Sequence, residues 1–295
     1  MQRFWIALYR LYFWPKAVLH RVTERWPSTS KPIALGKRWM RTFLLPKGPV
    51  WVRVKAGLSN GLAMRLRFPE ETSVWLGEHE PEVQNAISSI VRPGWVVFDI
   101  GANVGTHSLG IARIVGQTGR VVAFDGDPVN AERLREHAAA NDMESTLQVV
   151  HAAVWSSSEG KIIPFRCGRA MRSQGGVEVD GNRPVLGTGD LITVPVVSLD
   201  EFVASGSRAP DLIKIDVEGG EMQVLRGGAK LFRRKRPMFI AEIHTTRARD
   251  EIRLWMGSNA YSASETILAD PVPIRLLAWP KEDDPGPWAQ SVDQA

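Results

Sequence analysis

Apolar residues along this chain fall into short unbroken runs that alternate with amphipathic stretches. The runs occupy residues 95–100, 120–125, 147–155, 211–216 and 237–243, and helix-like stretches lie near 105–115, 129–140, 219–232 and 246–257. Strands without polar alternation are buried on both faces, and strands that alternate with helices form a mainly parallel sheet. The pattern therefore predicts a doubly wound α/β domain over residues 94–280.

The segments around this domain have other patterns. Residues 50–76 alternate like a strand, with Asn60-Gly61 as a hairpin turn signal, and a helix is expected over residues 81–91, so residues 50–93 are predicted to form a lead-in of hairpin and helix. Within the domain, residues 166–193 are rich in Gly, Arg and Ser and are long for a plain connection, which makes them a candidate substrate loop. Residues 261–279 are predicted to close the sheet as a hairpin before a tail at 281–295.

Charge separates the first segment, residues 1–49, from the rest. Residues 1–55 hold twelve Lys and Arg residues and one acid, whereas the rest of the chain holds 25 basic and 31 acidic residues. Aromatic and basic residues interleave over residues 1–26, which suits the surface of an anionic membrane. A helix packed on the body, with its arginines in solvent, is an equal alternative, and RNA binding is a third that no RNA-binding motif accompanies.

Composition narrows the class of protein. The chain is 44% hydrophobic, which suits a packed globular core. Its one cysteine, Cys167, excludes an intrachain disulfide and the usual cysteine zinc sites. The chain also lacks a run of eighteen apolar residues and a cleavable signal peptide. We therefore expect a cytoplasmic protein whose contact with a membrane, if the arm makes one, is peripheral.

The run at 95–100 leads into a glycine loop within the segment VVFDIGANVG, residues 96–105. Glycines let the backbone turn sharply and approach a ligand, and the following helix presents free amides, so a nucleotide-like ligand is expected at this edge. An NAD site would read G-x-G-x-x-G, whereas this loop reads D-x-G-x-x-x-G. The acid, Asp99, suits a positively charged amino group, which favours S-adenosylmethionine over NAD.

Two further strand ends carry acids. Asp125 ends the next run, about twenty residues after the glycines, where an acid can accept both hydroxyls of a ribose. Asp127 is expected to cap the following helix. In DLIKIDVEGGE, residues 211–221, Asp216 and Glu218 reach the carboxyl edge of the sheet, and Glu221 suits the first turn of a helix.

These motifs together resemble the FkbM family of methyltransferases. The resemblance covers about residues 75–245 and consists, in order, of WLGEHEPE, VVFDIGANVGTHS, VVAFDGDP, VVSLDEF, LIKIDVEGGEMQVLRGG and AEIH. It implies a Rossmann-like Class I methyltransferase fold, with a mainly parallel seven-stranded sheet and helices on both faces. It also implies methyl transfer from S-adenosylmethionine, usually to a hydroxyl of a sugar or polyketide-like acceptor.

The resemblance also implies roles for individual residues. The cofactor-binding residues that it implies are Asp99, Gly101, Asn103 and Gly105 for the methionine part, Asp125 for the ribose, and Asp216 with Glu218 facing the methionine end and the acceptor. The family commonly has Glu-Pro where this chain has Asp125-Gly126. The shorter acid keeps the charge but reaches less far toward the ribose.

Methyl transfer is an in-line displacement, so the protein must align the acceptor oxygen and remove its proton. The candidate general bases are Asp216, Glu218, Glu242 and His244. His244 has a suitable pKa for a base but could equally be a hydrogen-bonded structural residue, and His107 is expected to pack or cap. Carboxylates at this edge could gather a divalent ion, but no spacing compels one, and we expect no required metal.

Three other functions compete with this interpretation. An RNA methyltransferase would hold phosphates with the basic arm. A non-catalytic module would bind S-adenosylmethionine without turnover, and an NAD-dependent oxidoreductase is disfavoured by the loop spacing. We expect a small-molecule or glycan acceptor, a lipid-linked sugar among them, and no nucleic-acid partner.

Overall fold

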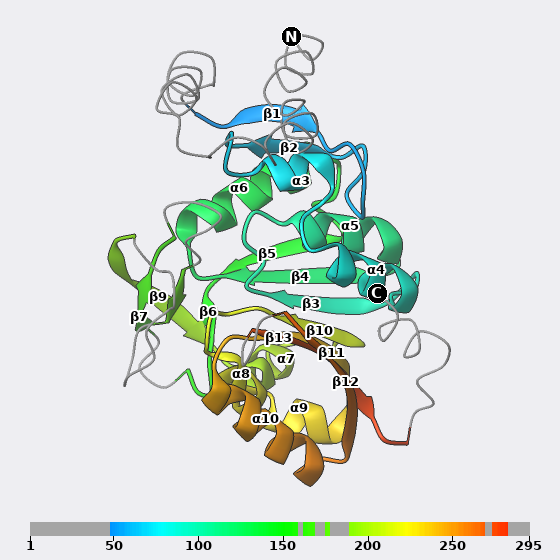
Figure 1. Ribbon diagram of the computed structural model, residues 1–295, viewed down its shortest axis with the longest axis vertical. Coiled ribbons are helices and arrows are strands. Elements are labelled where there is room, and N and C mark those ends of the chain that lie inside the picture. The colour runs from blue at the N-terminus through cyan, green and yellow to red at the C-terminus, as the bar shows by residue number, and fades with distance from the viewer. Residues whose placement is uncertain (1–47, 159–161, 169–174, 178–188, 269–272, 283–295) are drawn as a thin grey trace, which may run out of the picture.

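A seven-stranded sheet lies at the centre of the structure (Figure 1). The computed structural model describes residues 48–158, 162–168, 175–177, 189–268 and 273–282. The strands run in the order β12 (Tyr261–Ile267), β13 (Ile274–Pro280), β11 (Met238–Ile243), β10 (Leu212–Ile215), β3 (Val96–Ile100), β4 (Arg120–Asp125) and β5 (Leu147–His151). Strand β13 runs antiparallel to the other six described strands of this sheet, which are parallel to one another. The predicted Rossmann-like sheet and its closing hairpin are confirmed.

Helices cover both faces of the sheet and create two apolar cores (Figure 1). On one face lie α4 (Pro81–Ile90), α5 (Thr106–Val115) and α6 (Pro128–Ala139), and on the other lie α7 (Leu199–Ala204), α8 (Glu221–Gly227), α9 (Ala229–Arg234) and α10 (Thr246–Ser258). In β3, Val97 faces the first core and Phe98 the second. Burial on both faces is the reason that the strand sequences carry no polar alternation.

The lead-in is a short hairpin followed by a helix, docked on α6. Strands β1 (Val50–Arg53) and β2 (Ala63–Leu66) pair antiparallel as predicted, but a strand pattern up to residue 76 was wrong, because the chain forms α3 (Thr72–Leu76). Asn60-Gly61 is also not a two-residue turn, because residues 54–62 form one long connection. Its Leu58 is buried, and the Leu58 amide donates to the Gln84 side chain, so tertiary packing sets the connection.

A second, four-stranded sheet lies beside the carboxyl end of β5. The predicted strand at 147–155 was wrong as a single element, because it divides into β5 and β6 (Ala153–Val154). Strand β6 pairs with β9 (Leu191–Val197), which pairs with β7 (Ile162–Arg166), and β7 pairs with β8 (Gly176–Val177). The candidate substrate loop, residues 166–193, thus begins and ends in paired strands, and only part of it lies in the described residues.

The remaining predicted segments fall mostly outside the described part of the chain. The basic arm, residues 1–49, and the tail, residues 281–295, are described only at residues 48–49 and 281–282. Their predicted roles therefore stay predictions. Among the helices of the described residues, none combines the length and the apolar character needed to cross a membrane.

Candidate functional site

The glycine loop after β3 turns at the carboxyl edge of the sheet. Gly101 has a φ of +79°, and a Cβ placed there would lie 1.8 Å from the backbone oxygen of Asp216. The amides of Gly101 and Ala102 both donate to the carbonyl oxygen of Phe124, at the end of β4. Because only glycine combines this φ with so close an approach, the loop is held against two strand ends at once.

Asp125, at the end of β4, closes the other side of this loop. Its Oδ2 accepts the Asn103 amide at 2.7 Å, and its Oδ1 accepts the Asp127 amide at 2.8 Å. Burial raises the pKa of Asp125 to about 7, although these two amide hydrogen bonds oppose the shift. Asp127 accepts the Val129 amide at 2.8 Å and caps α6, which confirms its predicted capping role.

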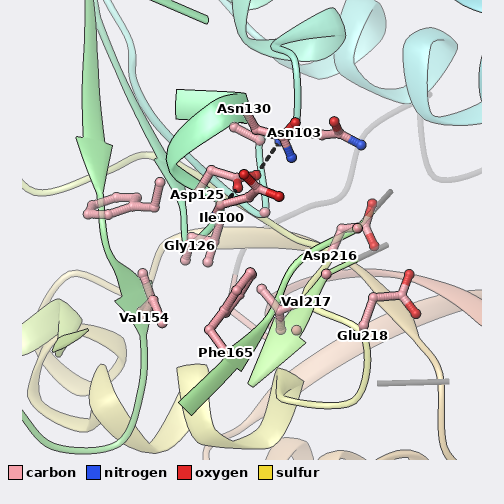
Figure 2. A pocket seen from close by; sticks show the side chains of 18 of the residues that line it. Ile100, Asn103, Asp125, Gly126, Asn130, Val154, Phe165, Asp216, Val217 and Glu218 are labelled. Carbon is pink, nitrogen blue, oxygen red and sulfur yellow. Dashed lines mark hydrogen bonds between the residues drawn. The ribbon is translucent and has the colours of Figure 1, made fainter. Parts of the chain in front are cut away.

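A cavity joins these strand ends (Figure 2). Of the predicted site residues, five line it: Gly101, Asn103, Asp125, Asp216 and Glu218. Four others do not line it: Asp99, Gly105, Glu242 and His244. Figure 2 shows Asp125 with Asn103 and Asn130 in one part of the cavity, and Asp216 with Glu218 in another. The predicted ribose acid and the predicted acceptor-side acids therefore share one space.

The side chains that line the cavity suit the charges of S-adenosylmethionine. Asp125 offers a carboxylate to a ribose, and the ring of Phe165 packs so closely on Gly126 that a Cβ there would lie 2.4 Å from it. That contact leaves a flat apolar wall beside the ribose acid. Asp216, at the far part of the cavity, offers negative charge to a sulfonium and an amino group. The donor set thus suits a cofactor with a nucleoside at one end and a positive charge at the other.

Asp99 lies beneath the cavity. Its carboxylate is fully buried, with Oδ2 accepting the Ser108 hydroxyl at 2.5 Å and Oδ1 3.4 Å from Lys214 Nζ. Lys214 is itself buried and lies 3.4 Å from Asp216 Oδ2. Burial lowers the pKa of Lys214, but Asp99 and Asp216 outweigh that effect and raise it. Asp99 therefore holds the Lys214 ammonium in place, and Lys214 in turn holds Asp216 at the cavity wall.

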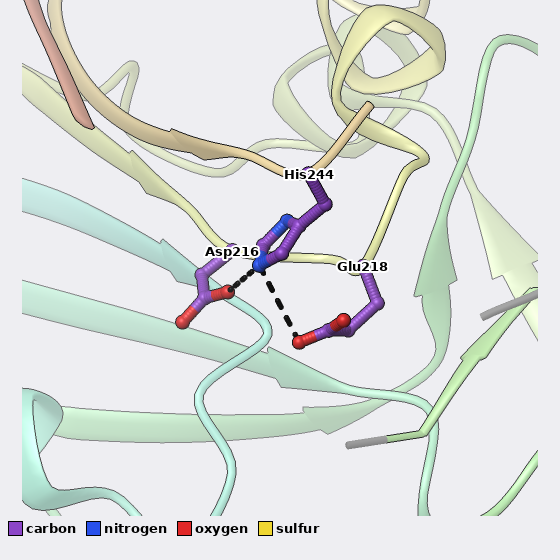
Figure 3. A group of neighbouring side chains, drawn as sticks. All are labelled: Asp216, Glu218 and His244. Atoms are coloured by element: carbon purple, nitrogen blue, oxygen red, sulfur yellow. Dashed lines mark ion pairs between the residues drawn. The ribbon is translucent and has the colours of Figure 1, made fainter. Parts of the chain in front are cut away.

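His244 follows β11 and lies beside Asp216 and Glu218 (Figure 3), and Glu221 and Glu242 complete a ring of carboxylates around it. Its Nδ1 is 2.8 Å from Glu221 Oε1, a fully buried carboxylate. Its Nε2 lies 3.7 Å from Asp216 Oδ1, 3.4 Å from Glu218 Oε1 and 3.6 Å from Glu242 Oε1. Burial lowers the pKa of His244, but the surrounding carboxylates, Glu221 and Glu242 foremost, raise it to about 11.

The backbone of the acidic turn after β10 explains how Glu218 reaches this ring. Glu218 has a φ of +54°, in the left-handed region, and Gly219 follows with a φ of +102°. The Gly219 amide donates to Glu221 Oε1 at 2.8 Å, so one carboxylate anchors both the turn and His244. Burial raises the pKa of Glu218 to about 7, His244 opposes this shift, and Asp216 adds to it.

The lead-in contributes residues that sequence reasoning did not assign to the site. Glu80, His79 and His107 line the cavity, and the two imidazole rings stack with their centroids 6.0 Å apart. Burial raises the pKa of Glu80 to about 7, and Asp216 adds to the shift. His107 is buried, as expected of a packing residue, but it also faces the cavity. The one sequence signal for Glu80 is its place in WLGEHEPE, immediately before the helix proline.

Comparison with known proteins identifies the family. The model of the Methyltransferase FkbM domain matches residues 99–263, which is more than half of the chain. Hexuronic acid methyltransferase AglP of Haloferax volcanii is 26% identical over 195 residues, which cover 60% of this chain and 72% of AglP. Ribosomal protein L11 methyltransferase of Myxococcus xanthus is 27% identical over 124 residues, 40% of this chain and 38% of that protein.

Solved structures give weaker matches. A methyltransferase FkbM from Methylobacillus flagellatus has a TM-score of 0.45 at 15% identity, over 67% of this chain and 54% of that one. Fibrillarin of Aeropyrum pernix with bound S-adenosyl-L-methionine has a TM-score of 0.41 at 13% identity, over 64% of this chain and 67% of that one. The chain thus spans about half the length of the solved FkbM methyltransferase.

Proposed function

The chain belongs to the FkbM methyltransferase family, whose cofactor is S-adenosylmethionine, and we propose that it transfers the methyl group to a hydroxyl of a sugar. The observation that carries this proposal is the single cavity lined by the ribose acid, Asp125, and by the carboxylates of Asp216 and Glu218. The name of AglP, a hexuronic acid methyltransferase, supports a sugar as the acceptor.

The cofactor supplies a methyl group on a positively charged sulfur, and the residues around it orient it. Asp125 would accept the two ribose hydroxyls, and the Phe165 ring would cover the adenine. Gly101 and Asn103 would line the methionine part, and Asp216 would face the positive charge. This order directs the methyl group toward the part of the cavity that Asp216 and Glu218 share (Figure 2).

The charge of the cavity favours a neutral hydroxyl group as the acceptor, so we carry over from the name of AglP the sugar and not the acid. Glu80, Asp216 and Glu218 all line the cavity, and Lys214 is engaged by Asp99 and Asp216. Carboxylates accept hydrogen bonds from hydroxyl groups and repel phosphates and other anions. An RNA acceptor is therefore disfavoured at the site itself, and that alternative depends on the basic arm alone.

We propose Glu80 as the general base that accepts the proton of the acceptor hydroxyl. It lines the cavity and immediately precedes α4, whose start fixes its position. Gln84 fixes the loop before it by donating to the carbonyl oxygens of Gly77 and His79. A pKa of about 7 is well matched to a general base at neutral pH.

The proposal is tested with methyl-labelled S-adenosylmethionine and three acceptor panels: nucleotide sugars and glycans, lipid-linked sugars, and ribosomal RNA with ribosomal protein. We expect label on a sugar oxygen, located by mass spectrometry. Glu80→Gln should lower kcat roughly 100-fold or more, in the range of lost general-base catalysis, with an unchanged Kd for the cofactor. Label found only on RNA or protein would refute the sugar acceptor.

The N-terminal arm favours a lipid-linked sugar over a soluble one as the acceptor. Its interleaved aromatic and basic residues, 1–26, support a sugar presented at an anionic membrane. Sedimentation of the full chain with anionic liposomes, in low and high salt, is the direct measurement. Indifference of the protein to these liposomes would remove the lipid-linked version and leave the soluble sugars.

A further inference from the structure

The ring of carboxylates around His244 has the spacing of a metal site, and we propose that Asp216, Glu218 and His244 bind a divalent cation, with Glu242 as an additional ligand. One donor atom from each of the first three residues lies within 4.8 Å of the other two. Figure 3 shows both carboxylates directed at His244 Nε2. The sequence expectation was that no metal is required, and this proposal departs from it.

The distances argue against ordinary hydrogen bonds and for a shared ion. His244 Nε2 lies 3.4–3.7 Å from oxygens of Glu218 and Asp216, beyond the usual range for such a bond. Neighbouring ligands at about 2.1 Å from an octahedral ion lie about 3.0 Å apart. The three donor atoms, all within 4.8 Å of one another, can therefore share one ion after small shifts of their side chains.

Three donor atoms of the cluster are buried and have no hydrogen-bond partner among the described residues. They are Asp216 Oδ1, Glu218 Oε1 and His244 Nε2. The Glu218 and His244 side chains are only 3% and 8% exposed. Buried polar atoms normally have partners, because a missing partner costs the full desolvation of the group. A cation at the centre of the cluster would satisfy all three atoms together.

The orientation of the His244 ring supplies an independent argument. Nδ1 faces Glu221 Oε1 at 2.8 Å, and a carboxylate can only accept, so Nδ1 carries the hydrogen. A cation that binds at Nε2 displaces the proton carried there, and the lone pair released is aimed at Asp216 and Glu218. A carboxylate that orients a histidine through its other nitrogen is the usual outer-shell arrangement of metal-binding histidines.

Ligand chemistry and charge indicate the kind of ion. Carboxylate oxygens are preferred ligands of Mg²⁺ and Mn²⁺. Imidazole is a common ligand of first-row transition metals, and it binds Zn²⁺ and Fe²⁺ more readily than Mn²⁺. The cluster holds the carboxylates of Asp216, Glu218, Glu221 and Glu242. Lys214 and Arg275 face two of them, Asp216 and Glu242 respectively. The negative excess favours a divalent ion, and we take Mn²⁺ as the probe.

A role for the ion follows from its place, and this step rests on the proposed function. Asp216 and Glu218 line the cofactor cavity, so a cation between them would face the acceptor. Hydroxyl oxygens of a sugar are natural further ligands for an oxygen-binding ion. The cation would align the acceptor hydroxyl and make its proton easier to remove, and Glu80 would accept that proton.

The binding test uses the full chain without cofactor or acceptor. Free Mn²⁺ gives an EPR signal that is lost on binding, so titration yields stoichiometry and Kd. We expect one site per chain, weakened at least about tenfold in Glu218→Gln and also in Glu221→Gln, which changes the group that supports His244 and the turn carrying Glu218 without touching the ion itself. Glu132→Gln, at a side chain that is 66% exposed, makes the same change elsewhere and should bind Mn²⁺ normally.

Melting curves establish that each variant is folded, and Asp216→Asn serves as a second ligand variant if Glu218→Gln is not. Absence of Mn²⁺ binding by the wild type, or equal affinity in the folded ligand variants, would overturn the site. If Mn²⁺ binds and no sugar accepts a methyl group, the proposed function fails and the cation site stands. If EDTA-dialysed protein methylates a sugar at the full rate, the role of the ion in the reaction is refuted.

Discussion

Asp125 provides the sharpest prediction, because one carboxylate serves both the cofactor and the loop beside it. Burial raises its pKa to about 7 in the free protein, while only the ionised form accepts both ribose hydroxyls. The cofactor therefore has to bind the deprotonated carboxylate. As the pH falls below 7, binding must also remove a proton, so the Kd for S-adenosylmethionine should rise.

The size of this effect follows from the pKa. A pH of 5.5 is about 1.5 units below the pKa of Asp125, so only about one carboxyl in 30 is ionised. The Kd should therefore be roughly 30-fold higher than at pH 8, which corresponds to about 2 kcal/mol. Asp125→Asn should raise the Kd at pH 8 by about 100-fold or more, since hydrogen bonds to a charged group contribute about 1.5–3 kcal/mol each. The same variant should lose the part of the dependence on pH that comes from Asp125 and keep the part that comes from Glu80 and Glu218.

Isothermal calorimetry at pH 8, 7 and 5.5 measures these constants, with NAD as a second ligand that should not bind. Asp142→Asn is the matched control, because Asp142 is exposed and its φ of +56° is one that asparagine adopts readily. A wild-type Kd that stays constant from pH 8 to 5.5, or a slope in Asp125→Asn equal to that of the wild type, would show that this carboxylate does not hold the ribose.

Three further predictions concern the scaffold that positions the site. Gly101→Ala places a Cβ 1.8 Å from a backbone oxygen at a φ of +79°, so urea unfolding should show a loss of about 3 kcal/mol or more, whereas Gly116→Ala, with free space at +64°, should lose only about 1–2 kcal/mol. Glu71→Gln leaves the Arg133 guanidinium buried without its 2.6 Å ion pair and should destabilise the chain by about 3–5 kcal/mol; Glu71→Gln with Arg133→Met should recover part of this loss. Burial lowers the pKa of His137 to about 4, below its ordinary value of 6.5, so the unfolded state binds the proton more tightly and stability falls as the pH drops through this window. Between pH 7.5 and 5 the free energy of unfolding should fall by about 2 kcal/mol from this group, a component that His137→Gln should lack in urea titrations.

Much of the main sheet was predictable because its signals are local. Strands β3 and β4 are buried almost throughout, and their sequences accordingly carry no polar alternation. Gly101 was predictable because the chain must turn sharply at the end of its strand, and Asp125 because ligands bind at the carboxyl ends of parallel strands. The family motifs, which the match over residues 99–263 confirms, reinforced the same elements.

The errors arose where packing overrides local preference. Residues 147–155 are apolar throughout, yet the chain leaves the main sheet after β5 and continues in a second sheet through β6. Residues 72–76 follow an alternating stretch but form α3, whose Val74 and Trp75 are buried in the first core. The spacing of hydrophobic residues over a short segment does not determine which other strand or helix that segment packs against.

The sequence by itself determined the class of fold, the cofactor loop and the acids at the strand ends, because period, turn chemistry and strand termini depend on residues close together in the chain. Tertiary structure decided which of those acids meet. It brought Glu80 of the lead-in to the cavity, set Asp99 beneath it, and placed Glu221 behind His244 so that Nε2 faces Asp216. Those contacts depend on how separate elements pack across the sheet, and a side chain's partners, burial and pKa exist only once that packing is in place.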